Sequence, residues 1–311
     1  MPKLYAIGGV TVDLVGSPYK PLKLHDSNPG TIKLSFGGVA RNIAENAVRC
    51  DTEVVLMSLF GDDAFGQLCY QYCEQLGMDF NFSKIKENQR SATYLALLQN
   101  SGEMNCAVAD MEILSQIGEH DFDHGIDHMT QEDYCSIDTN LSVEVLESLC
   151  KRIPAKLAMD PISSQKAIKA KTILRYLSVF KPNIIEAELV CGFQIKTDED
   201  IHKALDYFVQ SGVKETILTC GDKGLYFTDG LHKYHLRHQA VNTVNTTGAG
   251  DALLGVYLSY RLKGYSMVEA CEWGLCASYL TVQSEDTVVD TLNIETLKKI
   301  KSEIFIEREV F

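Results

Sequence analysis

The segment from Asn245 to Asp251 has the clearest capacity for chemistry, because its sequence is Asn-Thr-Thr-Gly-Ala-Gly-Asp. It precedes an apolar run, Ala252 to Leu262, that is long enough for about three helical turns. Free N–H groups at the start of a helix bind phosphate, and Gly248 and Gly250 have no Cβ to keep an anion away from the main chain. A carboxylate at Asp251 would repel that phosphate unless it takes a proton from an attacking hydroxyl. The same residues could equally form a glycine turn followed by a carboxylate that the helix dipole favours.

A second pair of glycines, Gly37 and Gly38, precedes an expected helix over residues 39–48. Such a helix start lets a polar ligand contact main-chain N–H groups, and Asn42 lies one turn into the helix. Asp13, expected at the end of a strand, is suited to accept hydrogen bonds from two sugar hydroxyls. An ordinary helix start and a capping aspartate would produce the same pattern.

Two further segments follow expected strands. The oxygens of Asn183 and Glu186 are spaced to share one face of a helical turn and could hold Mg²⁺ through water, as phosphoryl transfer requires. A capping box would use the same two residues. Thr219, Gly221 and Gly224 lie between two short strands, where a glycine turn could admit a nucleotide or simply close a hairpin.

Composition limits the classes of function. The chain has 311 residues, is 45% hydrophobic and carries a formal net charge of −13, which argues against nucleic acids and anionic membranes as partners. The ten cysteines include no Cys-x-x-Cys pair, and the N-terminus has no signal-peptide layout. We therefore expect a cytoplasmic protein with reduced thiols, folded as a single domain over residues 1–311.

The elements that must position these residues alternate between strand and helix. Alternation with short loops predicts an α/β fold with a mostly parallel sheet covered on both faces, and such sheets bind ligands at the carboxyl ends of their strands. The hairpin predicted around residue 102 does not fit this alternation, so we interpret segments 12–35 and 90–112 as a small β-sheet lid. The expected strands are 4–15 (with an interruption at Gly8-Gly9), 54–59, 92–99, 105–109, 156–159, 179–181, 216–220, 225–227 and 235–244, and the expected helices are 39–48, 64–76, 142–152, 167–177, 199–210 and 252–262. The polar residues expected at strand ends are Asp13, Asn140, Asp160, Asn183, Thr219 and Asn245.

Taken in order, these segments resemble the ribokinase-like (PfkB-type) carbohydrate kinases over about residues 4 to 300. That resemblance implies a three-layer α/β/α sandwich with a small β-sheet lid, and a kinase that uses ATP and Mg²⁺. One Gly-Ala-Gly-Asp sequence is only moderately specific for this family, but four matching segments in the same order are strong evidence of the resemblance. The matching segments are Gly37-Gly38 with Asn42, Asn183-x-x-Glu186, Thr219-x-Gly221-x-x-Gly224 and Thr247-Gly248-Ala249-Gly250-Asp251.

Shorter segments resemble the pseudouridine kinase branch, which phosphorylates the 5′-hydroxyl of a C-nucleoside. Ribokinases usually carry Gly-Gly-Lys-Gly-Ala-Asn, so Val39-Ala40-Arg41 leans away from free ribose. A kinase for another sugar or nucleoside, such as ribose, adenosine or fructose, remains an alternative. A catalytically idle sugar-binding homologue is disfavoured because Asp251, Asn183 and Glu186 are all present. The segments that carry the finer resemblance are Asp26–Gly30, Gly37–Ala44, Gly102–Met104, Ala109–Met111, Asp138–Leu141, Asp160–Ser163 and Lys181–Asn183.

The resemblance implies a role for each matching residue. Asp251 would be the base on the 5′-hydroxyl, and the N–H groups of Gly248, Ala249 and Gly250 would stabilise the transferred phosphoryl. The ribose would contact Asp13, Gly37, Gly38 and Asn42; Mg²⁺ would be organised by Asn183 and Glu186; ATP would lie against Asn183, Thr219, Gly221, Gly224, Gly248 and Gly250. For the nucleobase, which needs amide-type partners, the candidates are Asn28, Thr93 and Asn140.

Three further expectations concern the edges of the site and the surface. Many family members have Asp at the position of Asn245, where it helps to hold an activating monovalent cation; the amide lacks that charge, so K⁺ should bind weakly or not at all. Packing of the lid strands predicts a homodimer. His120, His124 and His128 recur every four residues and could bind Zn²⁺, but Gly118 and Gly125 interrupt them and favour a solvated segment.

Overall fold

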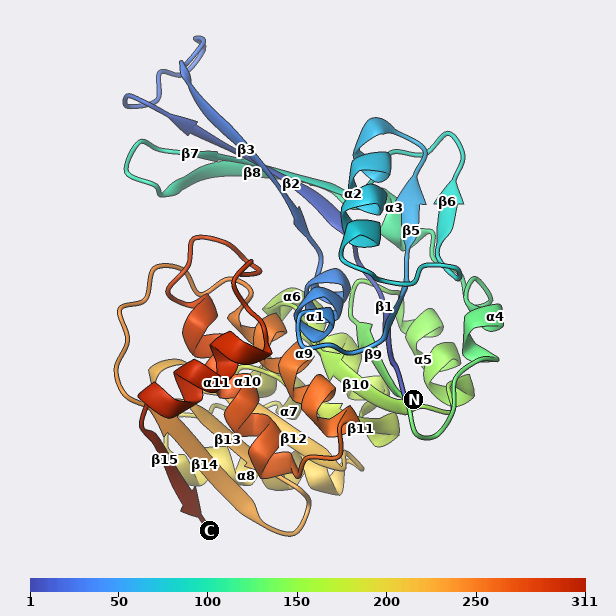
Figure 1. Ribbon diagram of the computed structural model, residues 1–311, viewed down its shortest axis with the longest axis vertical. Coiled ribbons are helices and arrows are strands. Elements are labelled where there is room, and N and C mark those ends of the chain that lie inside the picture. The colour runs from blue at the N-terminus through green and yellow to red at the C-terminus, as the bar shows by residue number, and fades with distance from the viewer.

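The computed structural model describes residues 1–311, and its main element is a nine-stranded sheet (Figure 1). Neighbouring strands are parallel from β4 through β1, β9, β10 and β11 to β12, and antiparallel from β12 through β13 and β14 to β15. The mostly parallel sheet is therefore confirmed. Its strands are β1 (Leu4–Ile7), β4 (Val54–Met57), β9 (Tyr134–Asp138), β10 (Lys156–Asp160), β11 (Leu177–Phe180), β12 (Glu215–Thr219), β13 (Leu225–Thr228), β14 (Lys233–His238) and β15 (Ile306–Val310).

Helices cover both faces of this sheet and give the three predicted layers (Figure 1). Side chains alternate along β1, so that Leu4 and Ala6 enter one core while Tyr5 and Ile7 enter the other. The first core is shared with α1 (Val39–Val48), α2 (Ala64–Gln75), α9 (Ala249–Leu262), α10 (Met267–Thr281) and α11 (Ile294–Glu303). The second is shared with α3 (Glu112–Ser115), α4 (Asp123–Ile126), α5 (Val143–Arg152), α6 (Ser164–Ala167), α7 (Ile184–Cys191) and α8 (Asp198–Gln210).

A separate four-stranded sheet projects from the body of the molecule (Figure 1). The hairpin predicted around residue 102 is present in it, and the sheet occupies the segments expected for a lid. A two-stranded pair, β5 (Leu59–Gly61) and β6 (Lys84–Lys86), lies apart from it. The four strands, in spatial order, are β3 (Gly30–Gly37), β2 (Thr11–Pro18), β7 (Thr93–Leu98) and β8 (Met104–Asp110).

The strand predicted over residues 4–15, with an interruption at Gly8-Gly9, is two strands in different sheets, because the chain leaves one sheet for the other at these glycines. The Gly9 N–H donates to Asp138 Oδ2 at 2.7 Å, and a Cβ on Gly8 would lie 2.2 Å from the same oxygen. Residues before this turn form β1 in the large sheet, and residues after it form β2 in the small sheet. Asp13 is therefore the third residue of β2 and does not lie at a strand end.

Two other predicted elements are also wrong in their extent. Residues 167–177 do not form one helix but α6 followed by two short 3₁₀ segments, η1 (Ile168–Thr172) and η2 (Leu174–Tyr176). The strand predicted over 235–244 ends at His238, because that residue forms the last pair with β15, opposite Ile306. Residues 239–248 that follow form no helix or strand. A third 3₁₀ segment, η3 (Gly221–Lys223), lies between β12 and β13.

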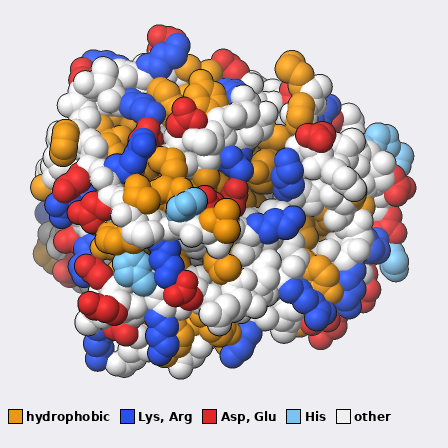
Figure 2. Space-filling model, turned by 90° about the horizontal axis from the view of Figure 1, so that it is seen from below, with side chains coloured by type: hydrophobic (Ala, Val, Ile, Leu, Met, Phe, Trp, Pro, Cys, Tyr) orange, Lys and Arg blue, Asp and Glu red, His pale blue; other side chains and the backbone are white.

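Stability depends on the two cores more than on surface charge. Figure 2 shows lysine and arginine side chains interspersed with aspartate and glutamate on one face of the molecule. Exposed ion pairs of this kind contribute about 0–1 kcal/mol each, far less than a buried apolar side chain. No helix combines the length and apolar character that crossing a membrane requires.

Candidate active site

A cavity of about 980 Å³ opens at the carboxyl ends of the parallel strands. Segments distant in sequence meet in its wall, because parallel strands present their carboxyl ends at one edge of the sheet. The wall contains every residue predicted for phosphoryl transfer and nucleotide binding, namely Asn183, Glu186, Thr219, Gly221, Gly224, Gly248, Ala249, Gly250 and Asp251.

The glycine loop places the N-terminus of α9 at this cavity. Gly248 is the N-cap residue with φ of +81°, and no side chain caps the helix. A Cβ on Gly248 would lie 2.0 Å from the Thr287 carbonyl oxygen, and one on Gly250 would lie 2.9 Å from Lys181 Nζ. The loop can therefore keep this conformation only with glycine at Gly248, whereas a side chain at Gly250 would displace the Lys181 ammonium. The uncapped helix N-terminus is a site that favours an anion.

Asp251 lies in the first turn of α9, with 7% of its surface exposed, and lines the cavity. Asn42 Nδ2 donates to Asp251 Oδ2 at 2.7 Å. Burial, and then the negative charge of Asp160, raise the pKa of Asp251 to about 7, although Asn42, Lys181 and Arg41 oppose the rise. A carboxylate with a pKa near neutrality can accept a proton from a hydroxyl and later release it.

Sequence reasoning missed the buried ion pair between Lys181 and Asp160, whose Nζ and Oδ2 atoms are 2.8 Å apart. Burial alone would lower the pKa of Lys181, but the carboxylates of Asp160, Glu186 and Asp251 together outweigh it and the pKa is raised. Asp160 ends β10 and Lys181 follows the neighbouring strand β11. Because the carboxyl ends of neighbouring parallel strands lie at one edge of the sheet, their positions in the sequence could have indicated this pair. Ile162, in the loop after Asp160, has φ of +69° and lines the cavity. Such backbone strain in a β-branched residue is typical of functional sites.

Asn183 and Glu186 form the capping box that was the alternative to a metal site. Asn183 Oδ1 accepts from the Glu186 N–H, and Glu186 Oε2 accepts from the Asn183 N–H, both at 2.9 Å. Burial, and then the charge of Asp160, raise the pKa of Glu186, which also lines the cavity. Two neighbouring carboxylates facing one cavity fit a divalent cation, because Mg²⁺ prefers oxygen ligands. Capping and cation binding are therefore compatible here.

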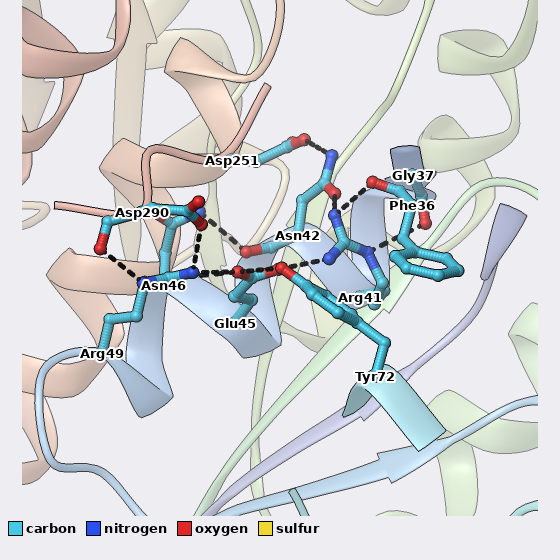
Figure 3. A network of polar contacts seen from close by, with 10 residues as sticks. All are labelled: Phe36, Gly37, Arg41, Asn42, Glu45, Asn46, Arg49, Tyr72, Asp251 and Asp290. Carbon is cyan, nitrogen blue, oxygen red and sulfur yellow. Dashed lines mark hydrogen bonds and ion pairs between the residues drawn. The ribbon is translucent and has the colours of Figure 1, made fainter. Parts of the chain in front are cut away.

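A polar network on α1 reaches Asp251 (Figure 3). Arg41 is almost fully buried, with 1% of its surface exposed. Its guanidinium donates to the carbonyls of Phe36 and Gly37 and to the side chains of Asn42 and Glu45. The network thus joins the end of β3 to the carboxylate in the cavity.

Comparison with known proteins agrees with this geometry. A model of the pfkB family of carbohydrate kinases matches residues 1–293. The chain belongs to this family. It is 31% identical over 292 residues to pseudouridine kinase from Escherichia coli, covering 93% of each chain. Its structure resembles that of a protein from Clostridium perfringens provisionally named a sugar kinase. The TM-score is 0.92 and the identity 28%, over 100% of this chain and 99% of the other. It also resembles, with a TM-score of 0.84 and 16% identity over 97% of this chain and 100% of the other, a protein from E. coli provisionally named ribokinase II in complex with ATP and Mg²⁺.

In this family member, four residues predicted for the sugar lie around the start of α1. A Cβ on Gly37 would lie 2.3 Å from Asp13 Oδ2, and Asp13 Oδ1 accepts from the Thr11 hydroxyl at 2.9 Å. Gly38 has φ of +94°, and its Cβ would lie 2.2 Å from the Gly9 carbonyl oxygen. Burial raises the pKa of Asp13. These residues and Asn42 form a second polar cluster, outside the wall of the cavity that Asp251 lines.

The residues predicted for the nucleobase do not line the cavity of the kinase. Asn28 lies in the β2–β3 connection, where its amide bonds to the N–H and carbonyl of Lys23 at 2.8 and 2.9 Å. Thr93 begins β7 and donates to the Ser91 carbonyl at 3.0 Å. Asn140 donates to Asp138 at 3.1 Å and accepts from Lys166 at 2.5 Å. Each side chain is bonded within its own part of the kinase.

Asn245 connects the glycine loop of the kinase to the loop after α10. Its Oδ1 accepts from the Thr247 N–H at 2.9 Å, and its Nδ2 donates to the Glu285 carbonyl at 3.3 Å. The amide nitrogen thus occupies a position beside a carbonyl oxygen where a cation would also be stabilised.

The histidines at 120, 124 and 128 form no metal site. His120 pairs with Asp123 at 2.8 Å, while His124 and His128 pack against Phe82 with ring centroids 5.3 and 5.0 Å away. No group of three or more His, Cys, Asp or Glu side chains has the spacing to hold a metal ion.

Proposed function

We propose that this kinase transfers the γ-phosphoryl group of ATP to the 5′-hydroxyl of a nucleoside, and that the nucleoside is pseudouridine. The observation that carries the transfer is the position of Asp251, buried in the same cavity wall as the uncapped N-terminus of α9. The nucleoside is suggested by the identity with the E. coli pseudouridine kinase and by the segments shared with that branch.

In this proposal Asp251 takes the proton of the attacking hydroxyl. Its pKa near 7 lets it be ionised before attack and hold the proton afterwards. The N–H groups of Gly248, Ala249 and Gly250 hydrogen-bond to the oxygens of the phosphoryl group as it moves. Lys181 adds a buried positive charge beside Gly250, and Asp160 keeps it ionised.

ATP and Mg²⁺ are proposed to occupy the cavity. Thr219, Gly221 and Gly224 contact the nucleotide, and apolar side chains in the wall, including Leu275 and Val282, suit the face of a purine. Asn183 and Glu186 would hold Mg²⁺ through water, and the cation would supply positive charge against the phosphates.

The acceptor is proposed to bind between the cavity and the small sheet, which acts as a lid. Asp13 accepts hydrogen bonds from the ribose hydroxyls, with Gly37, Gly38 and Asn42 beside it. Asn140 and Thr93 are the proposed partners of the base. Asn28 can do so only if its bonds to Lys23 are exchanged for bonds to the nucleoside.

The outer face of the small sheet is proposed to pair two copies of the kinase. Leu34, Leu14, Leu95 and Val108 are directly opposite one another across the four strands and so lie on one face. Leu95 and Val108 are 49% and 66% exposed, and Ile32 nearby is 79% exposed. Contiguous apolar surface of this kind is typical of an interface. Sedimentation should show a dimer, and L95K should convert it to a monomer.

An ADP-release assay with pseudouridine, uridine, ribose and adenosine tests the proposed substrate. We expect pseudouridine to have the highest kcat/KM. Failure to phosphorylate any nucleoside would exclude the proposal, and ribose or adenosine as the best substrate would move it to another branch of the family. Equal turnover of uridine would show that the base site does not distinguish a C-glycoside from an N-glycoside.

A further inference from the structure

The Asn42 amide has only one orientation that satisfies both of its neighbours. Arg41 presents N–H donors alone, so the atom facing it must be Oδ1. Asp251 presents an acceptor when ionised, so the atom facing it must be Nδ2, which lies 2.7 Å from Oδ2. The reversed amide would put two donors together on one side and two acceptors on the other. The guanidinium therefore decides which atom of Asn42 meets the carboxylate.

We propose that Arg41 is a positioning residue, which fixes the Asn42 amide and the end of β3 so that an N–H faces the Asp251 carboxylate. Nη2 bonds to the Phe36 carbonyl at 2.6 Å, and Nε bonds to the Gly37 carbonyl at 3.1 Å (Figure 3). The same planar group thus holds the last residues of a lid strand and the side chain that holds the base. Lysine cannot copy this set, because an ammonium lacks the rigid fork of donors.

Other partners of the network keep the local fold when Arg41 is replaced. Glu45, which is fully buried, also accepts from Arg49 Nη2 at 2.7 Å and from the Tyr72 hydroxyl at 2.9 Å. Arg49 is anchored on the far side by Asp290, at 2.8 Å. Removing Arg41 therefore leaves the Glu45 carboxylate paired.

The ionisation of Asp251 reports on this positioning. The charged groups that face it are Asp160 from β10, Lys181 from the loop after β11, and Arg41 from α1, with Glu186 of α7 next to Asp160. Asp160 raises the pKa of Asp251, whereas Lys181, Arg41 and the Asn42 N–H lower it. Replacing Arg41 removes one positive charge and frees the amide to turn. Both changes act in the same direction, so the pKa should rise.

The positioning role of Arg41 rests on the proposed role of Asp251 as base. The test below distinguishes failure of the positioning role from failure of the proposed function. In ¹³Cγ-aspartate-labelled kinase, the NMR resonance missing from D251N is assigned to Asp251, and its titration is followed without substrate. In R41M the midpoint of the Asp251 titration should rise by about one pH unit. The low-pH side of the pH profile of kcat, measured with the acceptor that the wild type uses, should move by the same amount. The matched control is R49M, which removes an arginine from Glu45 but contacts neither Asn42 nor Asp251; its midpoint should stay at the wild-type value.

The titration midpoints of the variants decide whether Arg41 positions Asn42. A midpoint in R41M equal to that of wild type, or equal shifts in R41M and R49M, would overturn it. If R41M does not fold, R41K keeps the charge without the fork, and an unchanged midpoint there would also overturn it. A shifted midpoint in an enzyme that phosphorylates no nucleoside would leave the positioning role standing and remove only the proposed function.

Discussion

The two ends of the site are built differently. At the proposed phosphoryl-transfer end, residues from four distant segments line one cavity and are held by buried contacts such as Lys181–Asp160. At the proposed acceptor end, Asp13 and Asn28 belong to a small sheet that projects from the body, and neither lines that cavity (Figure 1). Chemistry common to a family needs fixed geometry, which the large sheet supplies. Selection among acceptors is proposed to depend on the small sheet, which lies outside the cavity wall.

This contrast predicts that the largest loss of kcat occurs at the rigid end, in the D251N variant. Removing the proposed base should lower kcat by at least the ~10²–10⁴ typical of acid–base groups. Binding of the acceptor, measured by calorimetry, should change little because the amide keeps the shape of the carboxylate. A folded D251N enzyme with kcat near that of wild type would show that another group takes the proton.

A smaller loss is expected for G248A, also at the rigid end. The new Cβ would lie 2.0 Å from the Thr287 carbonyl, so the loop must shift and misplace its N–H groups. A displacement of ~1 Å can cost about 100-fold in rate, and we expect a fall in kcat of that order.

Gly264, just past the end of α9, supplies the control for G248A. It has φ of +86°, but a Cβ there would meet no atom within 4 Å. G264A should therefore carry the same kind of backbone strain, lowering Tm slightly, with kcat unchanged. Equal losses of kcat in the two variants would mean that strain, and not displacement of the loop, explains both.

At the acceptor end, D13A should act on KM. The variant removes a carboxylate that is proposed to bind two hydroxyls, and a hydrogen bond to a charged group contributes about 1.5–3 kcal/mol, or roughly a 10- to 100-fold rise in KM. The kcat at saturation should stay within about threefold of wild type, since the cavity is intact. A fall in kcat without a rise in KM would place Asp13 in the transfer step and remove the distinction between the two ends.

Sequence reasoning succeeded at the rigid end because regular helices and strands, whose ends can be read from the sequence, build that end. The helix over residues 39–48 was predicted with the bounds it has, because Gly37-Gly38 marks its start. Strand ends located Asn183 and Thr219 in the cavity wall. It failed where the cause lies outside the local sequence. The interruption at Gly8-Gly9 and the lid segment from residue 12 were predicted, but the side chain that holds the turn, Asp138, lies far along the chain and could not be identified from them.

The strength of the buried ion pairs was also beyond what local sequence patterns could predict. The pairing of Lys181 with Asp160 joins side chains 21 residues apart, and its strength depends on burial that only packing supplies. The partners of Arg41, by contrast, all lie within five residues of it, and Glu45 is one helical turn away; only the burial of this cluster depends on packing. Sequence spacing shows where side chains emerge from the sheet, whereas packing decides which of them remain charged.

The smallest effect is expected at Asn245, on the edge of the rigid end. Asn245 Nδ2 donates to the Glu285 carbonyl at 3.3 Å, so a neutral amide already stabilises the oxygen that a monovalent cation would approach. In N245D a carboxylate would face that carbonyl, and the repulsion should be relieved by K⁺. We expect the wild type to change less than about twofold when K⁺ replaces tetramethylammonium at constant ionic strength. N245D should be activated by about three- to tenfold, equivalent to roughly 1 kcal/mol. Equal K⁺ responses in the two enzymes would show that the amide does not substitute for a cation, and that the transfer end tolerates either residue without a bound ion.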